Sequence, residues 1–551
     1  MQMNQNRISL KSNTNLNILV ISAVLITLAL TPWVNSDSLI IPKGIILFCT
    51  SAFLIPKLVT KYHDLISLPG YKLIFWISLL FLLQMILVLV VTDSPIAQQF
   101  YGRTGRALGF ATYASLIIFL LSTAVFTNFN GAQIINLGLV LSCLFSSSYS
   151  IIQHLGFDVF DWVTATNGII GTLGNPNFQS SFAAMALTPS ILFLSGSRKN
   201  YIISFIATST LLYTLYISAS TQGYIASAVA IGVAILIYTW YKKKIFFIMS
   251  FLFFIVASVI ALAGMLNRGP LSYYLYKVSV QSRGEMWNTA MITIKANPIF
   301  GVGLDSFGDF SLTYRTEETA NGINEFIDNA HNLFLQFAIT GGIALSVLYA
   351  GIILLSLYSF FKIQRRLNGF NRNFTGIFAA WVCFQLQSLI SPANISMLVW
   401  NFILCGFLIG AAFNNNDQIL IRNVRGAGYS KSISYLFLMF ALIIMYPWYN
   451  VDKLAWKEYQ ARNATGLMSA TKMFPESSVR YSRVALELYK AKLFEQSLDI
   501  ARSSVKFNPN SVQGWFLILA NEKAPIEERR IARKKVLQLD PLNKEVISYN
   551  I

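Results

Sequence analysis

Charged residues are scarce in this chain, and this scarcity limits what the protein can be. Only 12% of the 551 residues are Asp, Glu, Lys or Arg, whereas 55% are apolar and 14% are aromatic. A soluble domain has about 25% charged residues, so the composition excludes an ordinary globular protein. The apolar residues come in blocks of about 20, the length that crosses a bilayer of about 30 Å. The sequence therefore predicts an all-α polytopic membrane protein.

Apolar blocks of this length predict about thirteen transmembrane helices. Their approximate limits are 16–34, 38–60, 71–92, 107–127, 132–153, 175–195, 201–219, 222–241, 245–265, 331–361, 374–391, 395–413 and 432–450. The first block follows a basic start at Arg7 and Lys11, as in a signal sequence. It lacks a convincing cleavage site of small residues, and further blocks follow at once, so we expect it to be retained.

Cysteine is also rare, with four residues in the whole chain. Cys49, Cys143, Cys383 and Cys405 all lie inside apolar blocks, without CxxC spacing or a neighbouring histidine. We interpret them as small core residues that do not report the redox compartment. We expect neither a metal site nor a cofactor.

The few charges are mostly basic, and the formal net charge is +18. In a soluble protein this excess would suggest nucleic acid, but here many basic residues stand beside apolar blocks, where they set orientation and meet anionic lipid. We therefore expect no nucleic-acid partner. Six basic groups fall on one side of the helix count, which should be the cytoplasm. They are Arg7 and Lys11; Lys57 and Lys61; Arg198 and Lys199; Lys242, Lys243 and Lys244; Arg365 and Arg366; and Arg422, Arg425 and Lys431.

This orientation divides the chain into three parts. We expect N-terminal transmembrane helices at 1–90, a transmembrane core at 91–450 that includes an extracytoplasmic segment at 267–330, and an extracytoplasmic helical domain at 451–551. Functional residues should lie in the outward segments, which include 92–106, 154–174, 267–330 and 391–394.

Two arginines stand in a short outward loop, although basic residues are favoured in cytoplasmic loops. Their position therefore suggests a function. Arg103 and Arg106 lie in YGRTGRALGF, just before a helix expected to begin at about Ala107. An arginine pair could grip a diphosphate through its planar, permanently charged forks. Snorkelling of the side chains to the membrane interface is the alternative.

A second cluster is SRGEMWNTAMITIKANPIFGVGLDSFGDF, residues 282–310. Its first half predicts an amphipathic helix lying along the membrane surface. The apolar face would contain Met286, Trp287, Ala290, Met291 and Ile294. Arg283 would stand at the start of this helix, a combination that favours an anion. The GVG that follows is too short for a phosphate loop, so we interpret it as a turn.

A third outward feature is GTLGNPNFQS, residues 171–180, where Gly174 and Pro176 should turn the chain into a helix. Asn175 and Asn177 would line the entrance of that helix. Amides at a turn suit hydroxyl-rich ligands, whereas capping of the helix start is the alternative role for each asparagine.

The C-terminal part differs in kind, because charge density rises after Val451 and the apolar residues follow helical spacing. A short motif that contains proline recurs there as FPESS, NPNSV and DPLNK. Its prolines, Pro475, Pro509 and Pro541, are spaced by 34 and then 32 residues. This period resembles that of tetratricopeptide repeats. A helical domain without repeats is the alternative. In either case we expect a surface for protein docking.

Several of these motifs together resemble one known superfamily. SRGEMWNTA, then NPIFGVGLDSFGDF, then HNLFLQFAITGG are similar to the shared core of the O-antigen ligases and Wzy-type polysaccharide polymerases, which also includes bacterial protein O-oligosaccharyltransferases. YGRTGRALGFATY and GTLGNPNFQSSFAAM resemble motifs that precede this core. The resemblance covers about residues 90–410, and similar members often carry a tetratricopeptide tail.

The resemblance implies a metal-independent glycosyltransferase of the inner membrane. Such an enzyme moves a glycan from a polyprenyl-diphosphate carrier, such as undecaprenyl diphosphate, to a hydroxyl group of a glycan polymer, lipid or protein on the outer leaflet. Ligase, polymerase and protein glycosylase remain open. The main alternative from another class is a flippase, which would place ionisable residues at the bilayer midplane, where this sequence has almost none.

The resemblance also gives roles to the motif DNAHN, residues 328–332. The acceptor alcohol must lose a proton as it attacks the anomeric carbon, and His331 is suited to receive that proton because its pKa lies near neutrality. Asp328 would orient the ring, and Asn332 would hold sugar hydroxyls. Asp328 or Glu325 could be the base instead.

The other site residues follow from the leaving group. By resemblance, Arg283 and Arg103 contact the diphosphate and stabilise the charge that grows on it, with Arg106 beside Arg103. The two remaining histidines, His63 and His154, match no position of the superfamily, and we assign them no role.

Overall fold

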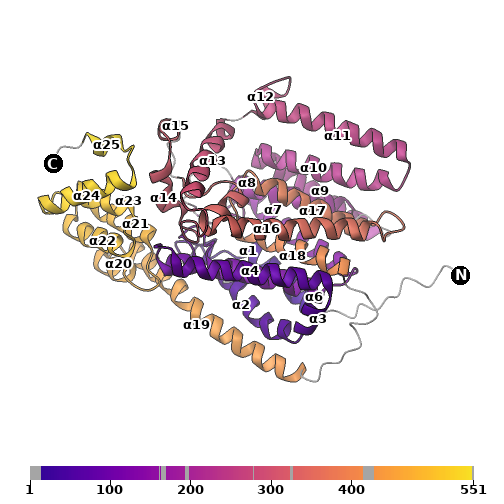
Figure 1. The fold of residues 1–551 in the computed structure, drawn as a ribbon, viewed down its shortest axis with the longest axis horizontal. Helices are drawn as coiled ribbons and strands as arrows, with labels where there is room; N and C mark the ends of the chain where they lie inside the picture. Colours follow the sequence, from indigo (N-terminus) through magenta and orange to yellow (C-terminus); the bar gives the residue numbers. More distant parts are fainter. Residues whose placement is uncertain are drawn as a thin grey trace.

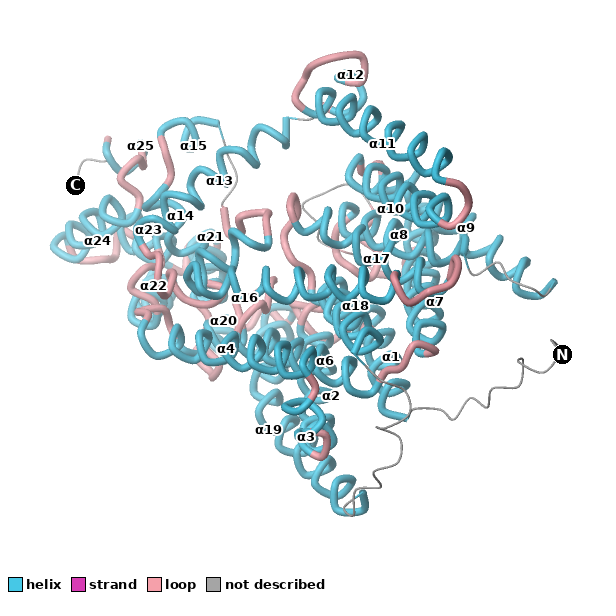
Figure 2. The backbone as a smooth tube through the Cα atoms, turned by 45° about the vertical axis from the view of Figure 1, so that its right-hand side comes forward, coloured by secondary structure: helices cyan, strands magenta, loops and turns pink. Residues whose placement is uncertain are grey.

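The computed structural model describes the ranges 14–160, 169–192, 198–276, 278–322, 327–413 and 427–548, together with residue 162. Arg7, Lys11, Glu325, Arg422 and Arg425 lie outside the described residues, as do the side chains of Arg198 and Lys199. Within these ranges every regular element is a helix and none is a strand (Figures 1 and 2).

The helices are numbered in chain order (Figure 1). They are α1 (Thr14–Leu28), α2 (Ile41–Val59), α3 (Tyr62–Ser67), α4 (Pro69–Val91), α5 (Ile96–Tyr101), α6 (Phe110–Phe126), α7 (Gly131–His154), α8 (Pro176–Leu192), α9 (Arg198–Ser218), α10 (Thr221–Trp240), α11 (Lys244–Met265), α12 (Ser272–Leu275), α13 (Val278–Ala296), α14 (Phe307–Tyr314), α15 (Glu317–Gly322), α16 (Leu333–Gln364), α17 (Arg372–Ser388), α18 (Ile395–Phe413), α19 (Ala427–Gln460), α20 (Ala464–Thr471), α21 (Ser478–Lys490), α22 (Phe494–Phe507), α23 (Val512–Ala520), α24 (Ile526–Leu539) and α25 (Lys544–Ile547).

Every apolar block predicted from the sequence falls on one of these helices, which confirms an all-α polytopic membrane protein. Among the described residues, nine helices are long and apolar enough to cross a membrane, namely α2, α4, α7, α9, α10, α11, α16, α18 and α19. Two further apolar helices, α1 and α6, are shorter. The first predicted block was too long, because α1 ends at Leu28 and Pro32 lies in the loop that follows.

The core of the bundle surrounds α18, whose apolar residues are almost all buried. Trp400 of this helix is fully buried, and its indole N–H donates to Thr27 Oγ1 at 3.0 Å. In contrast, α11 has an apolar span that is not buried inside the molecule. An apolar helix of this kind is suited to face lipid on nearly every side.

The long helix α16 is broken at Gly342, where the backbone has φ 81° and ψ 167°. A turn after α13 fills this break: the Val302 N–H donates to Ile339 O at 2.8 Å, and the Ile343 N–H donates to Pro298 O at 2.9 Å. The GVG motif is therefore a turn, and its hydrogen bonds satisfy backbone groups that the broken helix would otherwise leave unpaired.

Most of the predicted apolar face of α13 is buried in protein, whereas the sequence predicted that it lies along a membrane surface; Met291 of that face is exposed. Met286, Ala290 and Ile294 are buried in a cluster with residues of α14, α16 and the turn between α13 and α14. Arg283 is also not at a helix start, because α13 begins at Val278. The apolar pattern predicted the helix, but protein rather than lipid covers the face.

The loops gather at two opposite ends of the bundle. At one end, called the loop end below, the Asn394 side-chain N–H donates to Leu173 O at 3.2 Å. At the other, called the basic end, the Tyr241 hydroxyl donates to Gln364 O at 3.1 Å and so joins the turn at Lys242 to the turn at Arg365. The loop end comprises 29–40, 92–109, 169–175, 219–220, 297–306, 327–332 and 389–394.

The C-terminal helices α20 to α25 form a separate cluster beside α13, α14 and α15 (Figure 1). Helix α19 leads into it, since Ala455 of that helix belongs to the C-terminal core. Pro475, Pro509 and Pro541 each stand three residues before the first residue of a helix, at α21, α23 and α25. The spacing therefore marks helix starts, while the assignment to tetratricopeptide repeats remains a prediction.

Candidate functional site

Carboxylates hold the loop that contains the two outward arginines. Asp305 accepts the backbone N–H groups of Arg103, at 2.7 Å, and Leu108, at 2.9 Å. Asp37 accepts the N–H of Gly105 at 2.9 Å. The loop bends through positive φ at Ala107, so α6 begins at Phe110 and not at Ala107 as predicted.

Asp305 is a buried acid in this arrangement. Burial raises its pKa to about 6, against the two backbone hydrogen bonds, which favour the ionised form. Because its carboxylate holds both ends of the arginine loop, Asp305 fixes where Arg103 and Arg106 stand.

Arg106 forms a two-pronged ion pair with Asp328. Its Nε donates to Asp328 Oδ2 at 3.0 Å, and its Nη2 donates to Asp328 Oδ1 at 2.8 Å. The side chains are 22% and 26% exposed, so the pair is open to solvent. Burial alone would raise the pKa of Asp328, but Arg106 holds it below its usual value. Two residues predicted for different roles, Arg106 beside the diphosphate and Asp328 beside the ring of His331, thus contact each other.

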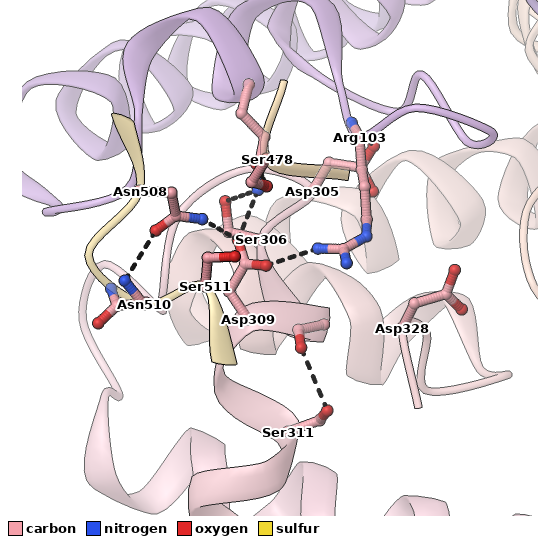
Figure 3. A network of polar contacts seen from close by, with 12 residues as sticks. Arg103, Asp305, Ser306, Asp309, Ser311, Asp328, Ser478, Asn508, Asn510 and Ser511 are labelled. Carbon is pink, nitrogen blue, oxygen red and sulfur yellow. Dashed lines mark hydrogen bonds and ion pairs between the residues drawn. The ribbon is translucent and has the colours of Figure 1, made fainter. Parts of the chain in front are cut away.

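Arg103 pairs instead with Asp309 of α14, with 2.6 Å between Nη1 and Oδ1. The two side chains are only 10% and 5% exposed. Asp309 also accepts the side-chain N–H of Gln98 at 2.8 Å and of Asn508 at 2.9 Å. Figure 3 shows the carboxylate between Arg103 and Asn508. Since Asn508 belongs to the C-terminal helices, Arg103 joins the membrane core to that domain.

His331 lies in the loop between α15 and α16 in a left-handed conformation, with φ 52°. Three side-chain amides fix the loop. Asn329 Oδ1 accepts the His331 N–H at 2.9 Å, and Gln336 Oε1 accepts the Ala330 N–H at 2.9 Å. Asn332 caps α16 by accepting the N–H groups of the next turn. A histidine held in this way at a helix start has a well-defined position.

The imidazole of His331 stands among cations. Burial, together with the nearby Arg106 and Arg283, lowers its pKa to about 4, although Asp328 acts in the opposite direction. His331 is therefore neutral at physiological pH and can accept a proton. Its Nδ1 is buried and has no hydrogen-bond partner within the part of the chain that the structure describes.

Arg283 reaches this group from the second turn of α13. Burial lowers its pKa, but an arginine remains charged at physiological pH. It forms no ion pair with any described residue. The structure thus brings Arg283, Arg106, Asp328 and His331 together, with Asn332 next in sequence.

Residues 206–350 match the family model described as O-antigen ligase. These residues, which are called the ligase domain below, therefore resemble the O-antigen ligases. This match confirms the resemblance noted from the motifs between residues 282 and 342, and at family level it indicates a membrane glycosyltransferase. The two earlier motifs, at 101–113 and 171–185, lie outside the matched residues. None of the curated proteins compared with the chain matches it.

The ligase domain begins within α9 and ends within α16. It contains Arg283, Asp328, His331 and Asn332. The arginine loop precedes it in sequence but packs against it through Asp305 and Asp328. The candidate site thus lies between the ligase domain and the loop at 102–109.

Asn175 and Asn177 also precede the ligase domain and lie at the loop end, and no hydrogen bond among the described residues joins either of them to His331. Asn175 Oδ1 accepts the Asn177 N–H at 2.8 Å, and Asn177 Oδ1 accepts the Ser220 hydroxyl at 2.7 Å. Asn175 therefore makes the helix-start contact that was the alternative to ligand binding. The side chain of Asn177 is exposed.

Sequence reasoning missed Asn329, Asp305 and Asp309, although all three lie in the motifs quoted for the superfamily or beside them. It also missed Lys43, which is fully buried at the start of α2. The Lys43 ammonium donates to Thr172 O and, at 3.1 Å, to Ser396 Oγ. The signal was a lysine inside an apolar block, where a buried charge needs polar partners.

No group of three or more His, Cys, Asp or Glu side chains that could hold a metal ion occurs in the described ranges.

Proposed function

We propose that this protein transfers a glycan from a polyprenyl-diphosphate carrier to a hydroxyl acceptor on the outer leaflet of the inner membrane. One observation carries the proposal: a neutral histidine and two arginines meet at the loop end, within and beside the ligase domain. Acid–base and charge-stabilising groups are what such a transfer needs, and no cofactor or metal enters it.

His331 is the proposed base. It receives the proton of the acceptor hydroxyl as the oxygen forms a bond to the anomeric carbon. The bond between that carbon and the diphosphate oxygen breaks, and the diphosphate leaves with the electron pair. With a pKa of about 4 in the donor-free protein, the imidazole is unprotonated at physiological pH and accepts this proton once the charge of the diphosphate offsets the arginines.

Arg283 and Arg106 are the proposed contacts of the diphosphate, because both are close enough to His331 to lower its pKa. Their planar forks match phosphate oxygens, and charge grows on those oxygens in the transition state. Arg103, by contrast, is enclosed with Asp309, so we assign it to positioning of the loop rather than to direct contact.

Asn332, Asn177 and Asn175 are the proposed contacts for sugar hydroxyls, with Asn175 acting through its side-chain N–H because its Oδ1 caps the start of α8. Asn177 is the most accessible of the three. Asn332 uses Oδ1 to cap α16 and donates its side-chain N–H to Leu389 O at 3.2 Å, so it would also hold the 389–394 turn beside His331.

The side of the membrane can be tested with topology reporters. A reporter active only outside the cytoplasm should be silent when fused after Lys243, at the basic end. It should be active when fused after Tyr549, which lies outside the described residues and follows the C-terminal domain. The opposite pattern would place the site in the cytoplasm and would overturn the proposal.

The acceptor can be identified by comparing lipid-linked glycan, free polymer and glycoproteins in a deletion strain. Loss of long chains with single units kept on an acceptor would indicate a polymerase. Loss of all glycan from an acceptor, with full-length lipid-linked chains accumulating, would indicate a ligase or protein glycosylase. The C-terminal domain is the proposed docking surface for a protein or polymer acceptor.

The decisive experiment uses the purified full-length protein with a polyprenyl-diphosphate-linked glycan and a candidate acceptor. We expect release of polyprenyl diphosphate together with a covalent product, and strong loss of both in His331→Ala. Movement of intact donor across vesicle membranes without a covalent product would instead support a flippase.

A further inference from the structure

Arg106 and Asp328 are held by an interaction that a diphosphate could replace oxygen for oxygen. Two nitrogen atoms of the guanidinium donate to the two oxygens of one carboxylate, at 3.0 and 2.8 Å. Phosphate presents oxygens to the same fork. At 22% and 26% exposure this pair is also accessible, whereas the pair of Arg103 and Asp309 is enclosed. Arg106 is thus the arginine of its loop that a ligand can reach.

The ring of His331 needs an acceptor that it does not have in this conformation. When one ring nitrogen of a histidine receives a proton, the other carries a hydrogen that must be bonded to hold the ring in place. Nδ1 of His331 is buried and unpartnered among the described residues. The Oδ1 atoms of Asn329 and Asn332 already accept backbone N–H groups.

Asp328 is the acceptor that can meet this need. Its charge and the charge of His331 each shift the pKa of the other, so the two groups are neighbours. The two-pronged pair with Arg106, however, fixes the carboxylate in a position where no hydrogen bond among the described residues joins it to His331. The base and its orienting group are therefore kept apart by the same arginine that the donor would bind.

We propose that donor binding exchanges the partner of Arg106: the diphosphate takes the guanidinium, and the released Asp328 accepts a hydrogen bond from His331 and orients it. This inference rests on the proposed function and adds an order of events to it. Asp328 becomes a positioning residue, and Arg106 becomes the residue that senses the donor.

The exchange would protect the donor from water. Before the donor binds, His331 faces two arginines and has no oriented ring, so it is a poor base. After the donor binds, phosphate charge offsets the arginines and Asp328 holds the ring, so the acceptor hydroxyl is activated only when an anomeric carbon is present. Coupling of this kind favours donor binding before acceptor activation.

The test separates binding from transfer in Asp328→Asn, which releases Arg106 but cannot act as an anionic acceptor. Binding of farnesyl diphosphate to the purified full-length protein is measured by calorimetry, and transfer is measured in a single turnover with lipid-linked glycan. We expect Asp328→Asn to bind farnesyl diphosphate about 3- to 10-fold more tightly, because no ion pair has to be broken. Transfer should fall by at least about 10-fold.

A double-mutant cycle identifies Arg106 as the cause. Arg106→Gln should weaken binding of farnesyl diphosphate, and in that background Asp328→Asn should give no gain. The matched control is Glu528→Gln, which breaks a two-pronged pair with Arg502 on the C-terminal domain. It should not change the affinity for farnesyl diphosphate. If Asp328→Asn does not fold, Asp328→Ser releases the same arginine and the same results are expected.

Equal or weaker binding in the folded Asp328 variant would overturn the exchange, as would a gain that persists in Arg106→Gln. If the wild-type protein binds farnesyl diphosphate but forms no covalent product with any lipid-linked glycan, the proposed function fails. The affinities of the Asp328 and Arg106 variants for farnesyl diphosphate test the exchange of partners independently of that outcome.

Discussion

Gly301 and Gly342 allow two backbone segments to touch at the break in α16. Both residues have positive φ, at 66° and 81°. A Cβ atom at Gly342 would lie 1.9 Å from Ile299 O, and one at Gly301 would lie 2.2 Å from Ile339 O. The contact follows the C-terminal end of α13, the helix that carries Arg283 near its start. It joins this end to the first part of α16, which begins beside His331 and ends at the break. The distance between these two site residues therefore depends on a pair of glycines.

Gly342→Ala should destabilise the protein by about 1–3 kcal/mol, because a side chain at positive φ and a clash with a carbonyl oxygen both oppose the native backbone. Thermal unfolding in detergent measures this change. Gly369→Ala is the control, since a Cβ there meets no atom within 4 Å. Equal unfolding temperatures of the two variants would contradict the account of the break.

His331→Ala should lower turnover by roughly 10²- to 10⁴-fold, the usual range for a positioned base. Donor binding should survive, because a neutral imidazole adds little attraction for a diphosphate held by arginines. Single-turnover transfer and donor affinity are measured in the same membrane mimic. Unchanged transfer in His331→Ala, with collapse in Asp328→Ala, would give the base role to the carboxylate; Glu325, the other acidic rival, lies outside the described residues.

The pH dependence of kcat/KM for the donor should report the pKa of His331 in the donor-free protein, which is lowered to about 4. A base is active when unprotonated, so transfer should stay level from neutral pH downward and fall only as pH approaches that value. Arg283→Gln removes a cation that lowers the pKa, so the fall should move to higher pH. Rates for both proteins between pH 4 and 8 test this sign, and a shift to lower pH would exclude the arginine as a neighbour of the base.

Arg283→Lys should lose most of the activity although the charge is kept. Lysine offers a point charge, whereas the guanidinium offers two donors in a fixed fork. Transfer and protein level are compared with wild type. Wild-type turnover of the lipid-linked donor at normal protein level would remove Arg283 from the diphosphate contacts. Arg103→Lys should also lose activity, but through the buried contact with Asp309.

Asp309→Asn should loosen the C-terminal domain. The change removes the carboxylate that pairs directly with the buried guanidinium of Arg103, and breaking a buried pair in this way costs about 3 kcal/mol. We expect a lower unfolding temperature and faster proteolysis in the helices after α19. Asp499→Asn is the control, because its partner Lys472 is exposed. Resistance to protease equal to wild type would show that Asp309 does not secure the domain.

The sequence predicted the helices well because apolar blocks in a membrane protein have one stable form. It also brought Arg283, Asp328 and His331 into one site, since the motifs that contain them flank the same outward segment. It did not predict that α13 buries its apolar face in protein, because the pattern of Met286, Ala290 and Ile294 suits lipid and protein equally.

The pairing of charged residues that are far apart in the chain also could not be predicted from the sequence. Arg103 and Arg106 look alike in sequence, but one is enclosed with Asp309 and the other is open beside Asp328. Which aspartate each arginine reaches depends on Asp305, which fixes the loop from about 200 residues away in the chain. Contacts of this range have no local pattern. Asn329 was missed for the opposite reason, because its role is one backbone hydrogen bond to a neighbour.

The carboxylate of Asp309 has a mechanical consequence. Asn508 holds it from the C-terminal helices, while Arg103 holds it from the loop that also positions Arg106. Thr104 of the same loop contacts Ser477, the cap of α21, with 2.8 Å between the hydroxyl oxygens. A molecule that binds the C-terminal domain and shifts it would therefore displace, through these polar contacts, the loop beside the candidate base. The position of the C-terminal domain and the position of that loop are coupled.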